Sequence, residues 1–212
     1  MSLGFLYPRL ELDESYNDNI FATRSGTKSD FITDPKPRLN LVSNFGRHAF
    51  NLSAAADLGW YASHSPENYQ DAYTAANGRY DIDQGQHIFA NAEIGRLHTA
   101  RTAPDFPGAA AQPPIYTTYL AGLGYGQDRL PVTYRGDVSV QRSEYQAVPA
   151  VGGGQINQSD RNNTTYTLAL QGGYSLNPNC MRAMTTISIA ICTAPSSQVS
   201  TRSSRMRDSF FG

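Results

Sequence analysis

The sequence predicts an all-β protein, an antiparallel up-and-down transmembrane β-barrel of which about eight strands are visible. Three observations predict it. Segments of ten or more residues alternate apolar with polar side chains, which is the period of a pleated strand. Short connections take turns with long polar ones, as in barrels that have tight turns on one side of a membrane and longer loops on the other. A composition of 40% apolar residues and a mean hydropathy of -0.45 suits a barrel with a wet lumen, which needs only one apolar face per strand.

Two kinds of break bound the expected strands. The tight breaks are Phe45-Gly46, Asp83-Gln84-Gly85, Asp128 to Pro131 and Asn177-Pro178-Asn179. The long polar stretches are 18–36, 63–70, 102–114 and 147–162. We therefore expect strands near 6–17, 37–44, 47–62, 71–82, 86–101, 115–127, 132–146 and 163–176, paired with their neighbours in sequence order.

Alternation justifies most of these strands individually. In the first strand the apolar set is Leu6, Leu10, Leu12 and Tyr16. In the seventh, Val132, Tyr134, Gly136, Val138 and Val140 oppose Thr133, Arg135, Asp137, Ser139 and Gln141. The third, fourth and eighth strands divide in the same way. The segments 86–101 and 115–127 alternate less cleanly, and their aromatic and β-branched content predicts the strand.

The two parities predict which side chains face lipid. We expect Phe50, Leu52, Leu58, Trp60, Val138, Val140, Leu168 and Leu170 on the lipid side. The expected lumen-lining residues are Arg9, Glu11, Asp13, Arg38, Arg47, Asp57, Arg79, Asp81, Arg135 and Asp137, with Gln171 beside them. A charge that faced hydrocarbon would cost about 2–4 kcal/mol near the midplane. The mixed signs favour neutral or weakly charged solutes, although the same residues can simply pair with one another and hold the strands in register.

Aromatic residues near strand ends are expected to form girdles at the membrane interfaces. They are Tyr16, Trp60, Tyr61, Tyr116, Tyr125 and Tyr174. We also expect an open, curved sheet in which Pro8 to Tyr16 and Tyr166 to Leu176 do not pair with each other.

A resemblance rests on the first forty residues. Gly4-Phe5, Pro8-Arg9-Leu10, the string Ser15 to Phe21, Ser29 to Ile32 and Pro37-Arg38-Leu39 resemble the opening of the outer-membrane β-barrel porins of Gram-negative bacteria that are associated with exopolysaccharide systems. The resemblance continues as strand rhythm to about Pro178. It implies a bacterial outer-membrane location, a barrel larger than eight strands, and outer-membrane lipid with polysaccharide or small polar solutes as partners.

The ends of the chain predict a fragment. Met1-Ser2-Leu3-Gly4 leads almost directly into the first strand without an export signal. Residues 1–179 are expected to be a partial barrel, and 180–212 an out-of-pattern tail in which only Thr185 to Cys192 suits a strand. A truncated or frame-shifted gene end and a genuine disordered tail both fit that change of composition.

Motifs for catalysis or metal binding are weak, so we expect no enzyme, catalytic residue, metal or cofactor. His48, His64, His87 and His98 lack metal-site or triad spacing and are expected to be solvated or lumen-facing. Asn17, Asp18, Asn19, Asp30 and Asp34 have oxygen ligands for Ca²⁺, but they are also ordinary turn formers. Net charge -1 gives no attraction to nucleic acid.

Two functions remain. One is a porin-like passive channel or polysaccharide-export-associated barrel for polar solutes. The other is a surface or secreted β-sandwich that binds carbohydrate. Strand length discriminates between them, because sandwich strands usually have about 5–6 residues.

Overall fold

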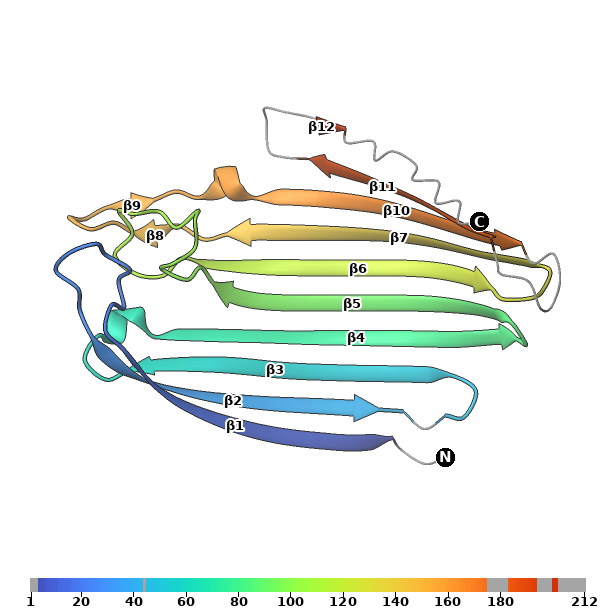
Figure 1. Ribbon diagram of the computed structural model, residues 1–212, viewed down its shortest axis with the longest axis horizontal. Helices are drawn as coiled ribbons and strands as arrows, with labels where there is room; N and C mark the ends of the chain where they lie inside the picture. Colours follow the sequence, from blue (N-terminus) through green and yellow to red (C-terminus); the bar gives the residue numbers. More distant parts are fainter. Residues whose placement is uncertain (1–3, 44, 175–182, 194–199, 202–212) are drawn as a thin grey trace, which may run out of the picture.

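The computed structural model describes residues 4–43, 45–174, 183–193 and 200–201. Within them, ten strands form one antiparallel sheet in the order β1-β2-β3-β4-β5-β6-β7-β10-β11-β12 (Figure 1). The strands are β1 (Phe5–Asn17), β2 (Asp30–Val42), β3 (Ala49–Tyr61), β4 (Tyr69–Asp83), β5 (Gln86–His98), β6 (Ile115–Gln127), β7 (Val132–Tyr145), β10 (Asn163–Tyr174), β11 (Ala183–Thr193) and β12 (Ser200–Thr201). The predicted all-β class, the eight long strands and their meander order are confirmed.

The remaining elements lie in two connections. A 3₁₀ turn, η1 (Ser65–Glu67), joins β3 to β4. The short strands β8 (Val148–Pro149) and β9 (Gln155–Ile156) and the 3₁₀ turn η2 (Ser159–Arg161) lie between β7 and β10. Among the described residues no helix is long and apolar enough to cross a membrane.

Long and short connections segregate to opposite ends of the sheet, as expected. The connections at 18–29, 62–68, 99–114 and 146–162 lie at one end, and those at 43–48, 84–85 and 128–131 lie at the other (Figure 1). This follows from an antiparallel meander, in which every second connection returns to the same end of the sheet.

Strand β2 begins earlier than predicted. We expected 37–44, with Pro35 and Pro37 in a loop, but the strand starts at Asp30. In the continuous β1–β2 register, Pro8, Pro35 and Pro37 pair with Leu39, Leu12 and Leu10, which all belong to one alternate set of pairs. A proline has no N–H to donate, so the pairs that contain prolines are the ones that exchange no backbone hydrogen bonds. The pairs between them form the backbone hydrogen bonds of the β1–β2 ladder. The β2–β3 pairs stop over residues 34–37 of β2 and resume at Arg38 in the same register.

The start of β3 also differs from the prediction. Strand β3 begins at Ala49 rather than residue 47, so Arg47 lies in the turn and donates a hydrogen bond to the carbonyl of Ile82. Beyond residue 179, β11 pairs along its length with β10 and includes the segment Thr185 to Cys192 for which the sequence allowed a strand. Residues 180–182, 194–199 and 202–212 of the expected tail lie outside the described residues.

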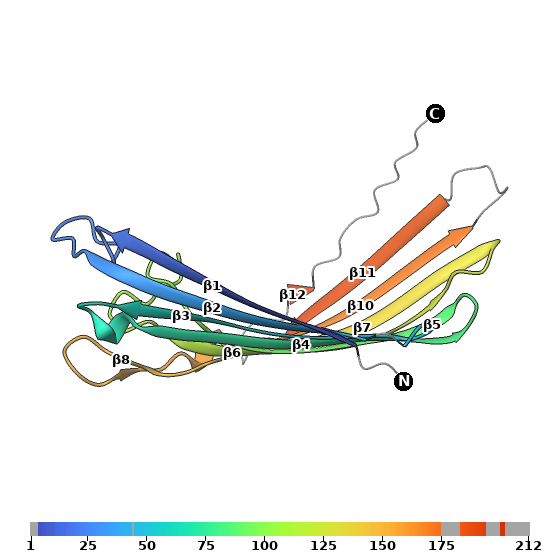
Figure 2. The ribbon, with the colours of Figure 1, turned by 90° about the horizontal axis from the view of Figure 1, so that it is seen from below.

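The sheet is curved and open within the described residues (Figure 2). Strand β1 pairs with β2 alone, and β10 lies between β7 and β11. The expected lack of pairing between Pro8 to Tyr16 and the last predicted strand is therefore confirmed over the described part, which ends at Tyr174 in β10.

One face of the sheet is apolar and uncovered. Every residue expected on the lipid side lies on it, because the registers from β1 to β10 place paired side chains on the same face. Among the described residues the buried apolar side chains Ile20, Ala110 and Val148 all lie in long connections, not between two layers. No second sheet covers the apolar face in the described part of the chain. This arrangement differs from a β-sandwich, whose two inner faces interdigitate.

Candidate functional site: the polar face of the sheet

The opposite face carries the predicted charged residues. Register places nine of the ten on it: Arg9, Glu11, Asp13, Arg38, Asp57, Arg79, Asp81, Arg135 and Asp137. Arg47 is the exception, because it lies in the turn before β3. Gln171 is on the same face, since it pairs with Arg135. Nothing in this geometry tests whether these side chains line a solute path, so that role stays a prediction.

Strands β1 to β3 carry a group of ion pairs, two of which cross between strands. Lys36 Nζ lies 2.5 Å from Asp13 Oδ2 and 3.2 Å from Asp34 Oδ2. Arg9 and Glu11 are 3.0 Å apart, and Arg38 and Asp57 are 3.5 Å apart. Lys36 and Asp34 were missed as wall residues because the sequence assigned them to a loop. Asp34 and Lys36 share one face with Ile32 and Arg38, which can be recognised only once the strand is known to contain both prolines.

Nearer the short connections, two ion pairs form within single strands. Arg79 and Asp81 of β4 are 3.0 Å apart, and Arg135 and Asp137 of β7 are 2.8 Å apart. The Arg135 guanidinium also lies 4.2 Å from the centroid of the Phe89 ring, so a cation–π contact adds to the ion pair. The guanidinium groups of Arg79 and Arg135 therefore each have a carboxylate beside them, and neither pair carries net charge.

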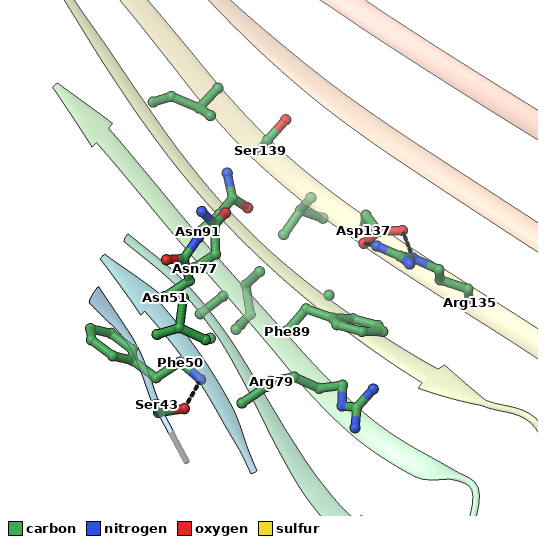
Figure 3. A pocket seen from close by; sticks show the side chains of 18 residues that line it. Ser43, Phe50, Asn51, Asn77, Arg79, Phe89, Asn91, Arg135, Asp137 and Ser139 are labelled. Atoms are coloured by element: carbon green, nitrogen blue, oxygen red, sulfur yellow. Dashed lines mark hydrogen bonds and ion pairs between the residues drawn. The ribbon is translucent and has the colours of Figure 1, made fainter. Parts of the chain in front are cut away.

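A hollow of about 540 Å³ lies between these two pairs on the polar face. Asn51, Asn77 and Asn91 come from neighbouring strands β3, β4 and β5 and lie side by side in it, with Ser139 of β7 beyond them (Figure 3). Sequence reasoning missed this row, although it noted Asn51 and Ser139 as polar-parity residues. The signal was present only in the strand registers, which depend on turn geometry.

The long connections are tied together rather than extended into solvent. Glu67, only 3% exposed, forms an ion pair with Arg101, whose guanidinium also donates hydrogen bonds to the carbonyls of Ala110 and Ala111. The same guanidinium lies 4.8 Å from the Phe106 ring centroid. One buried ion pair thus joins the β3–β4 connection to the β5–β6 connection.

Three of the four histidines lie beside carboxylates, and two of these are within hydrogen-bonding distance; the expectation that the histidines are solvated or lumen-facing stays a prediction. His64 Nδ1 is 2.8 Å from Asp30 Oδ2, and His98 Nδ1 is 2.8 Å from Asp71 Oδ2. The partners are 34 and 27 residues apart in sequence, so local spacing gave no sign of either pair. Among the described residues no group of three or more histidine, cysteine or acidic side chains is arranged to hold a metal ion.

Three of the five residues considered as Ca²⁺ ligands, Asn17, Asn19 and Asp30, accept hydrogen bonds from backbone amides. Asn17 Oδ1 accepts a hydrogen bond from the amide of Asn19, and Asn19 Oδ1 accepts one from the amide of Thr23. Asp30 accepts hydrogen bonds from the amides of Phe31 and Ser63. These oxygens act as turn formers, which is the second of the two interpretations open from the sequence.

Aromatic side chains border the apolar face near both ends. Toward the short connections these are Tyr80, Tyr125, Tyr134 and Tyr174, and toward the long connections Tyr16, Phe31 and Trp60. Two expected girdle residues are on the other face: Tyr61 pairs with Ile32 on the polar side, and Tyr116 stacks on Tyr145 with ring centroids 4.9 Å apart. A position near a strand end does not by itself place an aromatic residue on the apolar face, because successive side chains of a strand point to opposite faces.

Comparison with protein families agrees with this architecture. Residues 4–184 match the family described as "Putative beta-barrel porin 2". The chain belongs to this β-barrel porin family. The match covers β1 to β10 and the start of β11, which includes all eight long strands from β1 to β10. No curated protein and no solved structure gave a significant match.

Proposed function

We propose that this porin-family protein is a passive channel of the bacterial outer membrane, in which polar solutes diffuse along the polar face. The observation that carries the proposal is the division of one sheet into two faces. Large apolar side chains such as Leu123 and Val138, 56% and 53% exposed, cover one face, and paired charges with amides cover the other. Exposure of so large an apolar face to water is unfavourable, whereas the hydrocarbon of a bilayer solvates it. The polar face can then remain in contact with water.

Strand length supports the same function. The long strands from β1 to β10 have 12 to 15 residues, enough to cross a hydrocarbon core when tilted, which requires about 9–11. Outer-membrane lipid is then the partner of the apolar face. The carbohydrate-binding β-sandwich is not favoured by any contact among the described residues, because the apolar face has no second layer. Export of polysaccharide is a narrower form of the channel proposal that rests on the sequence resemblance.

Planar-bilayer recording tests the proposal. The purified protein should give ohmic conductance with weak ion selectivity, because wall charges such as Arg135 and Asp137 are paired. Replacing Arg135 with Glu puts two carboxylates on the polar face in place of a pair, so the reversal potential in a salt gradient should shift toward cation selectivity. Absence of conductance from a preparation that inserts into the bilayer would overturn the channel.

The same strand provides a matched control. Arg142 and Glu144 form a second pair two residues apart on β7, 2.7 Å between charged atoms, but on the apolar parity near the long connections. Arg142→Glu makes the same change of charge and should leave the reversal potential unchanged. An equal shift in both variants would mean that selectivity does not come from the polar face.

A further inference from the structure

Three asparagines occupy one level of the polar face. The register pairs Asn51 with Asn77, Asn77 with Asn91, Asn91 with Gly122, and Gly122 with Ser139. Adjacent strands are about 4.8 Å apart, so the three amides form an evenly spaced row running across β3, β4 and β5. Figure 3 shows the row pointing into the hollow, with Ser139 continuing the line.

The row has hydrogen-bonding capacity that the sheet does not use. Among the described residues none of the three amide side chains forms a hydrogen bond, and Asn51 Oδ1 is an enclosed acceptor without a partner. An amide offers two N–H donors and one oxygen acceptor. Buried polar atoms are normally satisfied, so the unpaired Asn51 Oδ1 marks the row as incompletely hydrogen-bonded within the protein.

Glycines give the row its space. A Cβ on Gly122 would overlap Asn91 Oδ1, and a Cβ on Gly124 would overlap Asp137 Oδ1. The Asn91 and Asp137 side chains therefore lie over the bare backbone of β6 instead of projecting from the wall. This leaves the hollow open above β6 between them.

The two arginines beside the row are already paired with carboxylates. Arg79 pairs with Asp81, and Arg135 pairs with Asp137 while its guanidinium covers the Phe89 ring. A charged ligand would have to compete with these internal partners. A hydroxyl group, which donates and accepts like an amide, meets no such competition.

We propose that Asn51, Asn77, Asn91 and Ser139 form a binding subsite for a neutral, polyhydroxylated solute of the saccharide class. This inference rests on the proposed channel, since it names the solute that the polar face holds during passage. Successive hydroxyls of such a solute match a row of donors and acceptors that is repeated from strand to strand.

Current blockage by a neutral sugar tests the subsite. Maltotriose added to the conducting protein should reduce the current in a saturable manner, and gluconate of similar polarity should block more weakly. The double variant Asn77→Ala/Asn91→Ala should weaken the maltotriose block by about tenfold, since each neutral hydrogen bond contributes about 0.5–1.5 kcal/mol. Thr74→Ala, on the apolar face of the same strand, should leave the block unchanged.

The outcomes separate this inference from the channel proposal. Conductance without any maltotriose block, or a block equally strong in the double variant, overturns the subsite and leaves the channel intact. If the protein does not conduct, calorimetry of maltotriose with the detergent-solubilised protein tests the subsite independently of the channel. Binding that is lost in the double variant supports the subsite, and no binding contradicts it. If the double variant does not fold, Ser139→Ala, which removes one hydroxyl at the end of the row, should weaken the block about threefold; no weakening contradicts the assignment.

Discussion

Replacing Val138 with Arg tests which face of the sheet meets hydrocarbon. Val138 is 53% exposed and pairs with Leu123 on β6 and Leu168 on β10, so its neighbours across both ladders are also apolar. A guanidinium at this position has no carboxylate beside it on the same face. In a water-soluble protein an exposed position of this kind would accept Arg at almost no cost.

The magnitude follows from the position of Val138 along β7. Tyr134 and Arg142 lie four residues to either side of it on the same face, about 13 Å along the strand in each direction. Strand tilt shortens this distance, which places Val138 near the middle of an apolar band about 25 Å tall. An Arg at the midplane of a β-barrel costs about 2–4 kcal/mol, and we expect that loss in the free energy of unfolding.

Unfolding of the vesicle-inserted protein by guanidinium chloride measures this loss in the free energy of unfolding. Trp60, the single tryptophan of the chain, is 48% exposed on the apolar face and reports the transfer from lipid to water. Gln141→Arg is the matched control, because residue 141 lies on the same strand but on the polar face. It should cost less than about 1 kcal/mol. A V138R variant that is as stable as Q141R would refute the assignment of the faces.

Two further predictions concern the ends of the sheet. Glu67→Ala leaves the Arg101 guanidinium without its buried partner, which should lower the stability of the long connections by about 3–5 kcal/mol. Trypsin should then cleave after Arg101 much faster than in the unmodified protein. Unchanged cleavage would show that the ion pair does not hold the connections together. Gly59→Ala places a Cβ against the Tyr69 ring and should destabilise the sheet by about 1–3 kcal/mol in the same unfolding assay, whereas a neutral result would mean that Tyr69 has room to move.

Most of the sheet was predictable because the period of a strand is local. The alternation of Val132 to Gln141 is sufficient to assign both faces of β7, and the tight breaks then fix the meander. Strand β2 was predicted too short for a local reason as well, since Pro35 and Pro37 usually mark a loop. Their tolerance depends on the β1–β2 register, in which both fall on pairs that exchange no hydrogen bond.

The candidate site was less predictable because it depends on pairs distant in sequence. Parity places Asn51, Asn77 and Asn91 on the polar face but does not bring them to one level. That alignment requires the registers of β3–β4 and β4–β5, the second of which shifts between Asp81 and Asp83. The His98–Asp71 pair has the same origin, since it joins residues that meet only through the β4–β5 pairing.

The ion pairs of the polar face are of two kinds, those within one strand and those that join neighbouring strands. Arg79–Asp81 and Arg135–Asp137 join positions i and i+2 of one strand, which lie on the same face whatever the register of the neighbours. They neutralise the wall without fixing the sheet. Lys36, in contrast, bridges Asp13 of β1, and Arg38 bridges Asp57 of β3, on both sides of the interrupted β2–β3 ladder. Both cross-strand pairs lie where the β2–β3 ladder is interrupted, and there they accompany the within-strand pairs Arg9–Glu11 and Lys36–Asp34.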